Sequence, residues 1–149
     1  MSIDNAGNPS QRAKMEKLRA EGLCLFCGEN YLLVDGSPKL YESTHWYVKE
    51  SDYPYPGSAK HLLIASRTHV CSLDELSEEA WSNFRKILRV VRNSISRPGL
   101  SLLVREGDST YTGSTYQHIH FHVIYGYPKP SDWKSVEENN VLATVGFKK

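Results

Sequence analysis

Several marks of membrane, secreted and nucleic-acid-binding proteins are missing from this sequence. No apolar run in its 149 residues approaches the roughly 20 that a membrane-spanning helix needs, and its polar start has no apolar signal-peptide core. Three cysteines are too few for a disulfide scaffold. The formal charge of +1 is far from the basic excess of a general nucleic-acid binder. We therefore expect a cytoplasmic protein with neither a membrane nor nucleic acid as its usual partner.

The composition that is present is that of an ordinary globular chain. Hydrophobic residues make up 40% of the sequence and charged residues 23%, which is enough apolar material for one core. There are no internal repeats. We expect a single domain over residues 1–149, with residues 1–8 flexible and residues 126–149 forming an irregular tail.

The most informative stretch is rich in histidine. Residues 117–124 read Gln-His-Ile-His-Phe-His-Val-Ile, and this alternation of polar and apolar residues predicts a half-buried β-strand. The apolar residues would face a core, which leaves His118, His120 and His122 together on the other face. Half of the chain's six histidines lie on this one face, which indicates chemistry rather than an ordinary solvent-facing strand.

The other expected elements alternate between strands and two helices. Asn8 can cap a helix that begins at Pro9 and ends near Gly22. A long amphipathic helix is expected over residues 73–97, and Ser77 can cap it. Strands are expected at residues 39–42, 45–49, 61–65 and 100–104, and a polar loop at 105–117. The predicted fold is α+β, a single antiparallel sheet of about five strands with one long and one N-terminal helix.

A Cys-x-x-Cys pair, Cys24 and Cys27, is followed directly by a glycine. Two thiolates at this spacing can reach one metal ion, usually zinc. The alternatives are two small buried hydrophobes or a thioredoxin-type redox pair, although the latter needs a βαβ context that is missing here. Zinc takes four ligands, so the pair alone leaves the metal and structural interpretations about equally open.

The run from His118 to Ile124 resembles the His-φ-His-φ-His-φ-φ signature of the histidine triad superfamily of nucleotide hydrolases and transferases. A second match lies upstream, where Gly57–Ile64 followed by Arg67–His69 is similar to the family's Gly-His-Leu-φ-φ-Pro-Lys-x-His segment. The long helix and the Gly-containing loop also come in the family's order. The resemblance spans roughly residues 24–125.

The resemblance implies a structural zinc ion, one per chain, and no organic cofactor. In zinc-bearing branches the metal is held by the Cys-x-x-Cys pair, the histidine ending the second motif and the first triad histidine. On this chain those residues are Cys24, Cys27, His69 and His118, a closed set with no open position for substrate.

The resemblance also implies the catalytic groups. His120 would be the nucleophile that attacks the α-phosphorus and forms a nucleotidyl-histidine, and His122 would donate to the phosphate or assist the leaving group. Arg105, Ser114 and Thr115 are placed to bind phosphate, although the two hydroxyls are equally well explained as turn residues. Many relatives have Asn near Arg105 and Gln at Ser114, which leaves the leaving group open.

Three functions are compatible with this sequence. The first is a nucleotide hydrolase that cleaves a nucleoside phosphoramidate or a dinucleoside polyphosphate of adenine or guanine. The second is a nucleotidyltransferase or phosphorylase with phosphate or a sugar phosphate as acceptor, and the third is a nucleotide-binding module with little turnover. A zinc ion held by the triad itself would leave the two cysteines without a role. Tyr47, Val48 and Tyr53 are candidates for base contacts, and a homodimer is implied by the resemblance alone.

Overall fold

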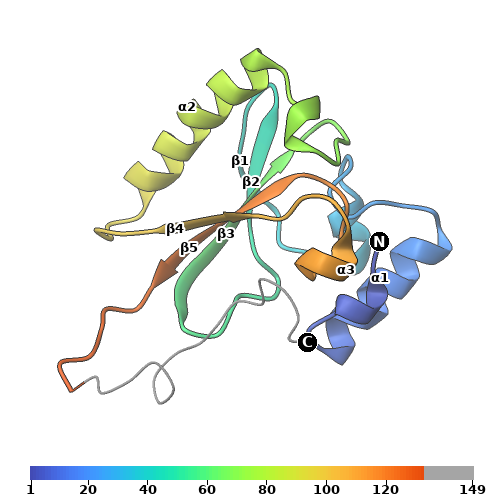
Figure 1. The fold of residues 1–149 in the computed structure, drawn as a ribbon, viewed down its shortest axis with the longest axis horizontal. Coiled ribbons are helices and arrows are strands. Elements are labelled where there is room, and N and C mark those ends of the chain that lie inside the picture. Colours follow the sequence, from blue (N-terminus) through green and yellow to red (C-terminus); the bar gives the residue numbers. More distant parts are fainter. Residues whose placement is uncertain (133–149) are drawn as a thin grey trace.

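A computed structural model of the chain describes residues 1–132, and the remainder of the predicted tail lies outside the described residues. Its centre is one antiparallel sheet of five strands in the order β1-β2-β3-β5-β4 (Figure 1). The strands are β1 Lys39–Glu42, β2 Trp46–Glu50, β3 Ser58–Ser66, β4 Ser101–Val104 and β5 His120–Gly126. The α+β prediction with a single antiparallel sheet is confirmed.

The sheet is covered on both faces. Helix α2, Glu78–Ser94, lies on one face, while α1, Pro9–Ala20, and the short α3, Ser109–Thr112, lie on the other (Figure 1). The α2 face holds the main core, where the rings of Phe84 and Phe121 are 4.2 Å apart and the Trp46 indole donates to the Ala80 carbonyl at 2.8 Å. A second cluster under α1 contains Met15, Phe26, Tyr47, Leu63 and Ala65. Both faces of β3 are therefore apolar, as in a fully buried strand.

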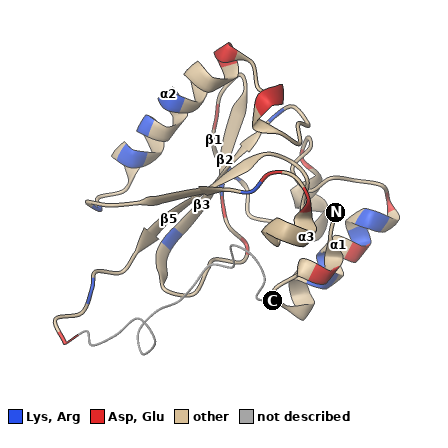
Figure 2. Ribbon diagram, in the orientation of Figure 1, with Lys and Arg blue, Asp and Glu red and all other residues tan. Residues whose placement is uncertain are grey.

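Helix α2 is shorter than the sequence predicts. Residues 73–75 form a separate 3-10 turn closed by a Ser72–Glu75 capping box, and Leu76 is extended. The helix then begins with Ser77 as its cap, whose hydroxyl accepts from the Ala80 N–H at 3.1 Å. It ends at Ser94 instead of Arg97: Ile95 is already extended, and Pro98 disfavours helical backbone at Arg97. Acidic residues mark its start and basic residues its later turns, as the helix dipole favours (Figure 2).

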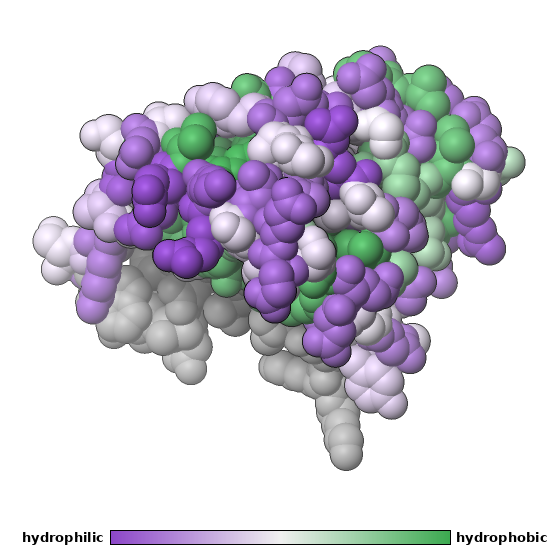
Figure 3. Space-filling view, turned by 90° about the horizontal axis from the view of Figure 1, so that it is seen from above, coloured by the Kyte–Doolittle hydropathy of each residue, from purple (hydrophilic) through white to green (hydrophobic). Residues whose placement is uncertain are grey.

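The surface is mostly hydrophilic, as expected for a globular protein. Hydrophilic side chains dominate much of the view in Figure 3, with apolar residues gathered between them. No helix within residues 1–132 has the length and apolar character needed to cross a membrane.

The histidine strand begins later than predicted. β5 starts at His120. The preceding Ile119 instead bonds to the last residue of β3 and to the chain after it: its carbonyl accepts from the Ser66 N–H at 3.1 Å, and its N–H donates to the Val70 carbonyl at 2.8 Å. His118 therefore lies in the bend before the strand. The apolar residues of this stretch face the α2 core as predicted, and the three histidines face the other side. That side is not open to solvent, since all three histidines are buried.

Candidate active site and metal centre

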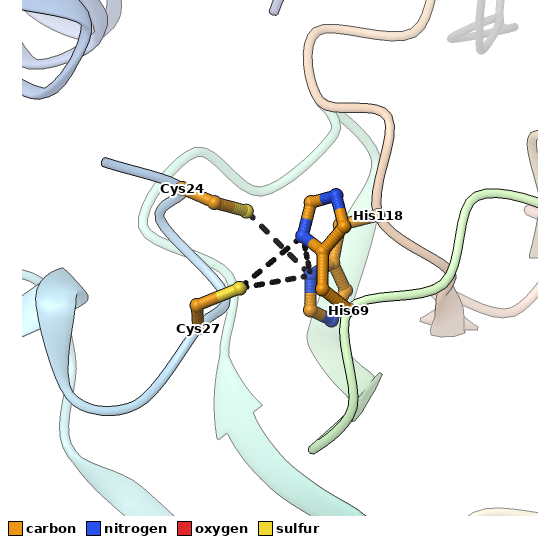
Figure 4. A group of neighbouring side chains, drawn as sticks. All are labelled: Cys24, Cys27, His69 and His118. Carbon is orange, nitrogen blue, oxygen red and sulfur yellow. Dashed lines mark hydrogen bonds between the residues drawn. The ribbon is translucent and has the colours of Figure 1, made fainter. Parts of the chain in front are cut away.

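Four sulfur and nitrogen atoms converge where the N-terminal turn meets the sheet (Figure 4). The ligand atoms of Cys24, Cys27, His69 and His118 all lie within 4.8 Å of one another. The His118 Nδ1 atom is 3.5 Å from the Cys24 Sγ, 3.7 Å from the Cys27 Sγ and 3.3 Å from the His69 Nδ1. Tetrahedral zinc with its usual bond lengths separates ligand atoms by about 3.3 Å for two nitrogens and about 3.5 Å for nitrogen and sulfur. The four residues fit a zinc ion.

Outer contacts orient these ligands in the way that metal sites need. The His118 Nε2–H donates to the Ser66 carbonyl at 2.8 Å, which leaves its Nδ1 lone pair for the metal. The Asn30 side chain donates to the Cys24 carbonyl at 2.9 Å and holds the turn. Burial raises the pKa of the Cys24 thiol to about 11, so a bound cation is what would keep it as a thiolate.

His120 is held as a neutral imidazole with a defined proton position. Its Nδ1 lies 2.6 Å from the His118 carbonyl oxygen, which can only accept, so the ring proton is on Nδ1. The lone pair is therefore on Nε2. The ring stacks on Phe26 with centroids 4.4 Å apart, and burial lowers the pKa of His120 to about 4. At neutral pH the Nε2 of this ring is therefore unprotonated and has a lone pair available.

A hydrogen bond from His61 determines which ring nitrogen of His122 has the proton. The backbone N–H of Tyr55 donates to the His61 Nδ1 at 3.0 Å, so neutral His61 has its proton on Nε2. That Nε2 lies 2.9 Å from the His122 Nδ1, which must accept. His122 is then left with its proton on Nε2. Burial lowers the pKa of His61 to about 4 and that of His122 well below its ordinary value.

Arg105 directly follows β4, and its side chain extends to His122. Its Nε donates to the Thr112 carbonyl at 3.0 Å and its Nη1 to the Tyr55 hydroxyl at 2.6 Å. The same Nη1 lies 3.3 Å from the His122 Nε2. The Tyr55 ring stacks on His122 at 5.4 Å. Arg105, Tyr55 and His122 thus form one contiguous group.

The loop between Arg105 and His118 contains α3 and is tied to the N-terminus. The Ser114 hydroxyl donates to the Tyr116 carbonyl at 2.9 Å, which is turn chemistry, and the Thr115 carbonyl accepts from the Ser2 N–H at 2.9 Å. The Asn5 amide donates to the carbonyls of Ser109 and Ser114 at 3.1 and 2.8 Å. The first residues, for which the sequence predicts flexibility, therefore hold the loop in the structure.

A cleft of about 430 Å³ connects these groups, within the size range of small-molecule sites. His120, His122, Arg105, Ser114 and Thr115 all line it. Of the residues considered for base contacts, Tyr53 lines the cleft. Tyr47 instead packs in the α1-side cluster, and Val48 is buried on the opposite face of the sheet.

Sequence reasoning missed two residues of this group, His61 and Tyr55. Both lie in segments read as an apolar strand and a turn. A signal was present in the strand: if Leu62 and Ile64 face the α2 core, the alternate residue His61 faces the triad side. Because the neighbouring Leu63 and Ala65 are also apolar, the alternation did not show which face was which.

The chain was compared with known proteins. No protein-family model matches it. It is 27% identical over 77 residues to the adenosine 5′-monophosphoramidase of Schizosaccharomyces pombe, a match covering 52% of this chain. The match covers 54% of that protein, so the chain spans about half the length of this curated relative.

Solved structures share the fold at low identity. A hypothetical histidine triad nucleotide-binding protein of Sulfolobus tokodaii is 22% identical with a TM-score of 0.57, covering 85% of this chain and 81% of that one. The Plasmodium falciparum diadenosine triphosphate hydrolase is 20% identical with a TM-score of 0.50, covering 67% of each chain. At these identities the likeness shows the fold. The triad signature and the curated match point to the same similarity, to proteins of the histidine triad superfamily.

Proposed function

We propose that the chain is a nucleotide hydrolase that cleaves at the α-phosphate of a nucleotide substrate through a covalent intermediate on His120. The observation that carries the proposal is the hydrogen bond from the His120 Nδ1–H to the His118 carbonyl. This hydrogen bond orients the imidazole ring and leaves the Nε2 lone pair available. The strand that holds the ring, β5, lies between β3 and β4 in the sheet. A positioned neutral imidazole is the form that can act as a nucleophile.

The reaction divides into two displacements. In the first, the His120 Nε2 attacks the α-phosphorus, an N–P bond forms and the bond to the leaving group breaks. In the second, water attacks the same phosphorus, the N–P electron pair returns to Nε2, and one proton is released to solvent with the nucleoside monophosphate. Positioning and charge stabilisation provide most of the rate enhancement in phosphoryl-type transfer.

The other predicted site residues have supporting roles. His122, with its proton on Nε2, donates a hydrogen bond to the phosphate or to the leaving group, and Arg105 supplies a fixed positive charge. Thr115 lines the same cleft. Ser114 also lines it, but its hydroxyl proton already serves the Tyr116 carbonyl, so its contribution to phosphate binding is the weaker of the two.

Cys24, Cys27, His69 and His118 would hold a structural zinc ion. The ion would stabilise the junction of the N-terminal turn and β5, and it supplies no group to the reaction because its four positions are filled by protein. His118 ties this junction to the nucleophile, since its backbone carbonyl orients the His120 ring.

Two alternative functions would use the same site. A nucleotidyltransferase would pass the nucleotidyl group from His120 to phosphate or a sugar phosphate, and a binding module would hold nucleotide with little turnover. The test is a panel of adenosine and guanosine phosphoramidates, dinucleoside polyphosphates and nucleotide sugars, with and without inorganic phosphate. Release of a nucleoside monophosphate without phosphate supports hydrolysis. A requirement for phosphate would replace hydrolysis with transfer, and nucleotide binding without turnover would leave only the binding module.

We also expect the chain to form a homodimer, as its resemblance to the family implies. Edge strand β4 exposes Leu102, an apolar side chain that a second copy could cover. Size-exclusion chromatography with light scattering should give twice the monomer mass of 16.9 kDa. A monomer mass at micromolar concentration would contradict this.

A further inference from the structure

The contact between Arg105 and His122 brings two hydrogen-bond donors together. The His122 Nε2 has a proton, because its Nδ1 accepts from His61. The guanidinium Nη1 of Arg105 can only donate, and it lies 3.3 Å from that Nε2. Two donors cannot bond to each other. They can share one acceptor placed between them, and a negatively charged oxygen is the strongest acceptor for such a pair.

The pair lies beside the nucleophile and on the cleft. The rings of His120 and His122 are 5.0 Å apart, and Arg105, His120 and His122 all line the same cavity. Arg105 is held in place at its Nε by Thr112 and at its Nη1 by Tyr55. The donors are therefore oriented before any ligand arrives, which is the arrangement that stabilises charge developing in a transition state.

We propose that Arg105 and His122 together bind the oxygen of an anionic leaving group, so that the enzyme acts on phosphoanhydrides, in which the nucleotide is joined to another phosphate, in preference to phosphoramidates. This inference rests on the proposed function and deepens it by naming the substrate class. It points away from the activity for which the fission yeast relative is named, that of an adenosine 5′-monophosphoramidase.

The reason lies in what each leaving group requires. When the P–O bond of an anhydride breaks, its electron pair stays on an oxygen of the leaving phosphate, which departs as an anion and needs only nearby positive charge. When the P–N bond of a phosphoramidate breaks, the nitrogen must gain a proton in order to leave. Arginine cannot supply that proton, because it is not deprotonated in proteins.

His122 is also poorly placed to be a proton donor to an amine. To donate efficiently it would have to be an imidazolium, and that charge would lie buried and 3.3 Å from a guanidinium nitrogen. Burial first, and then the neighbouring histidines and Arg105, lower its pKa well below the ordinary value. Neutral His122 can donate a hydrogen bond without giving up its proton. This suits an oxyanion and does not suit an amine.

The first test needs only the wild-type protein. kcat/KM is measured for diadenosine triphosphate and for adenosine 5′-phosphoramidate, and again for the guanine counterparts, with nucleotidyl-His120 followed by intact mass after rapid quenching. One oriented donor contributes about 10²–10³-fold to the rate at such a site. We therefore expect kcat/KM for the anhydride to exceed that for the phosphoramidate by at least about 10-fold. A preference for the phosphoramidate overturns the inference and leaves the proposed function standing.

The second test uses variants of Arg105. Arg105→Asn should lower kcat/KM for the anhydride by about 10²–10³-fold, the usual effect of removing one such donor, and that for the phosphoramidate by much less. Arg105→Lys keeps the charge without the rigid fork, and its loss should be intermediate. Arg85→Asn, an exposed arginine on α2, is the matched control. Equal losses on both substrates would overturn the inference.

The outcomes separate the two proposals. If no substrate gives a nucleoside monophosphate or a His120 adduct, the proposed function itself fails. If adduct and product form but the selectivity is absent or reversed, only the inference about the leaving group fails. Should Arg105→Asn lose its folded far-UV circular dichroism, the wild-type ratio and the Arg105→Lys variant still decide.

Discussion

Replacing His120 with alanine is expected to lower kcat by at least about 10⁴-fold, because the variant lacks the atom on which we propose that the covalent intermediate forms. The remaining groups of the site could still bind the nucleotide. The loss should therefore fall on kcat, while nucleotide binding measured by calorimetry changes little. No nucleotidyl adduct should be found by mass spectrometry.

The controls for this experiment separate chemistry from folding. His120 is 6% exposed and stacks on Phe26, so its removal leaves a small cavity that lowers stability somewhat. Unchanged metal content and far-UV circular dichroism would show that the variant is folded. His45→Ala, at a histidine near the start of β2 that lies beside Glu79 and outside the cleft, should retain activity. Turnover by folded His120→Ala at the wild-type rate would exclude the covalent mechanism.

Loss of the proposed zinc ion is the second large expected effect. Freshly purified wild type should contain about one zinc per chain, and Cys24→Ser with Cys27→Ser should contain none. Structural zinc contributes on the order of 10 kcal/mol in zinc-binding peptides. Losing even part of this should lower the Tm by at least about 10 °C in a chain of this size. Calorimetry and metal analysis on the same samples provide the measurement.

Cys71 offers a matched control for the cysteine variants. Its Sγ lies 3.6 Å from the Nε2 of His69, whereas the Nδ1 of that ring faces Cys27, and its thiol donates to the Gln117 carbonyl. Cys71→Ser should keep its zinc and most of its Tm. Wild-type protein that contains no zinc and loses no Tm in a chelator would rule out the metal site.

The sequence predicts those parts of the site that depend on spacing along the chain. Alternation in residues 117–124 places His120 and His122 on one face and Phe121 in the core, because a strand has only two faces. The Cys24–Cys27 spacing identifies half of the metal cluster for a similar local reason. Its two histidine partners required the family resemblance, since a bend before β5 and the end of β3 bring them to the cysteines.

The parts that were missed depend on contacts between distant segments. The link from His61 to His122 is a diagonal pair across β3 and β5, and it follows from a register in which Leu63 faces His122. Nothing in either strand alone determines that register. The same holds for Asn5, whose amide is bonded to a loop more than a hundred residues away along the chain.

The burial of His61, His120 and His122 makes the folded chain a poorer base than the unfolded one. The pKa of His61 and of His120 is lowered to about 4, whereas an unfolded histidine titrates near about 6.5. Above pH 6.5 both states hold these rings neutral, and the full stability is present. As the pH falls from 6.5 toward 4, these histidines become protonated in the unfolded chain but stay neutral in the folded chain. The free energy of unfolding therefore falls by up to about 1.4 kcal/mol per pH unit for each ring. Acid sensitivity is thus the thermodynamic counterpart of keeping these rings unprotonated inside the protein.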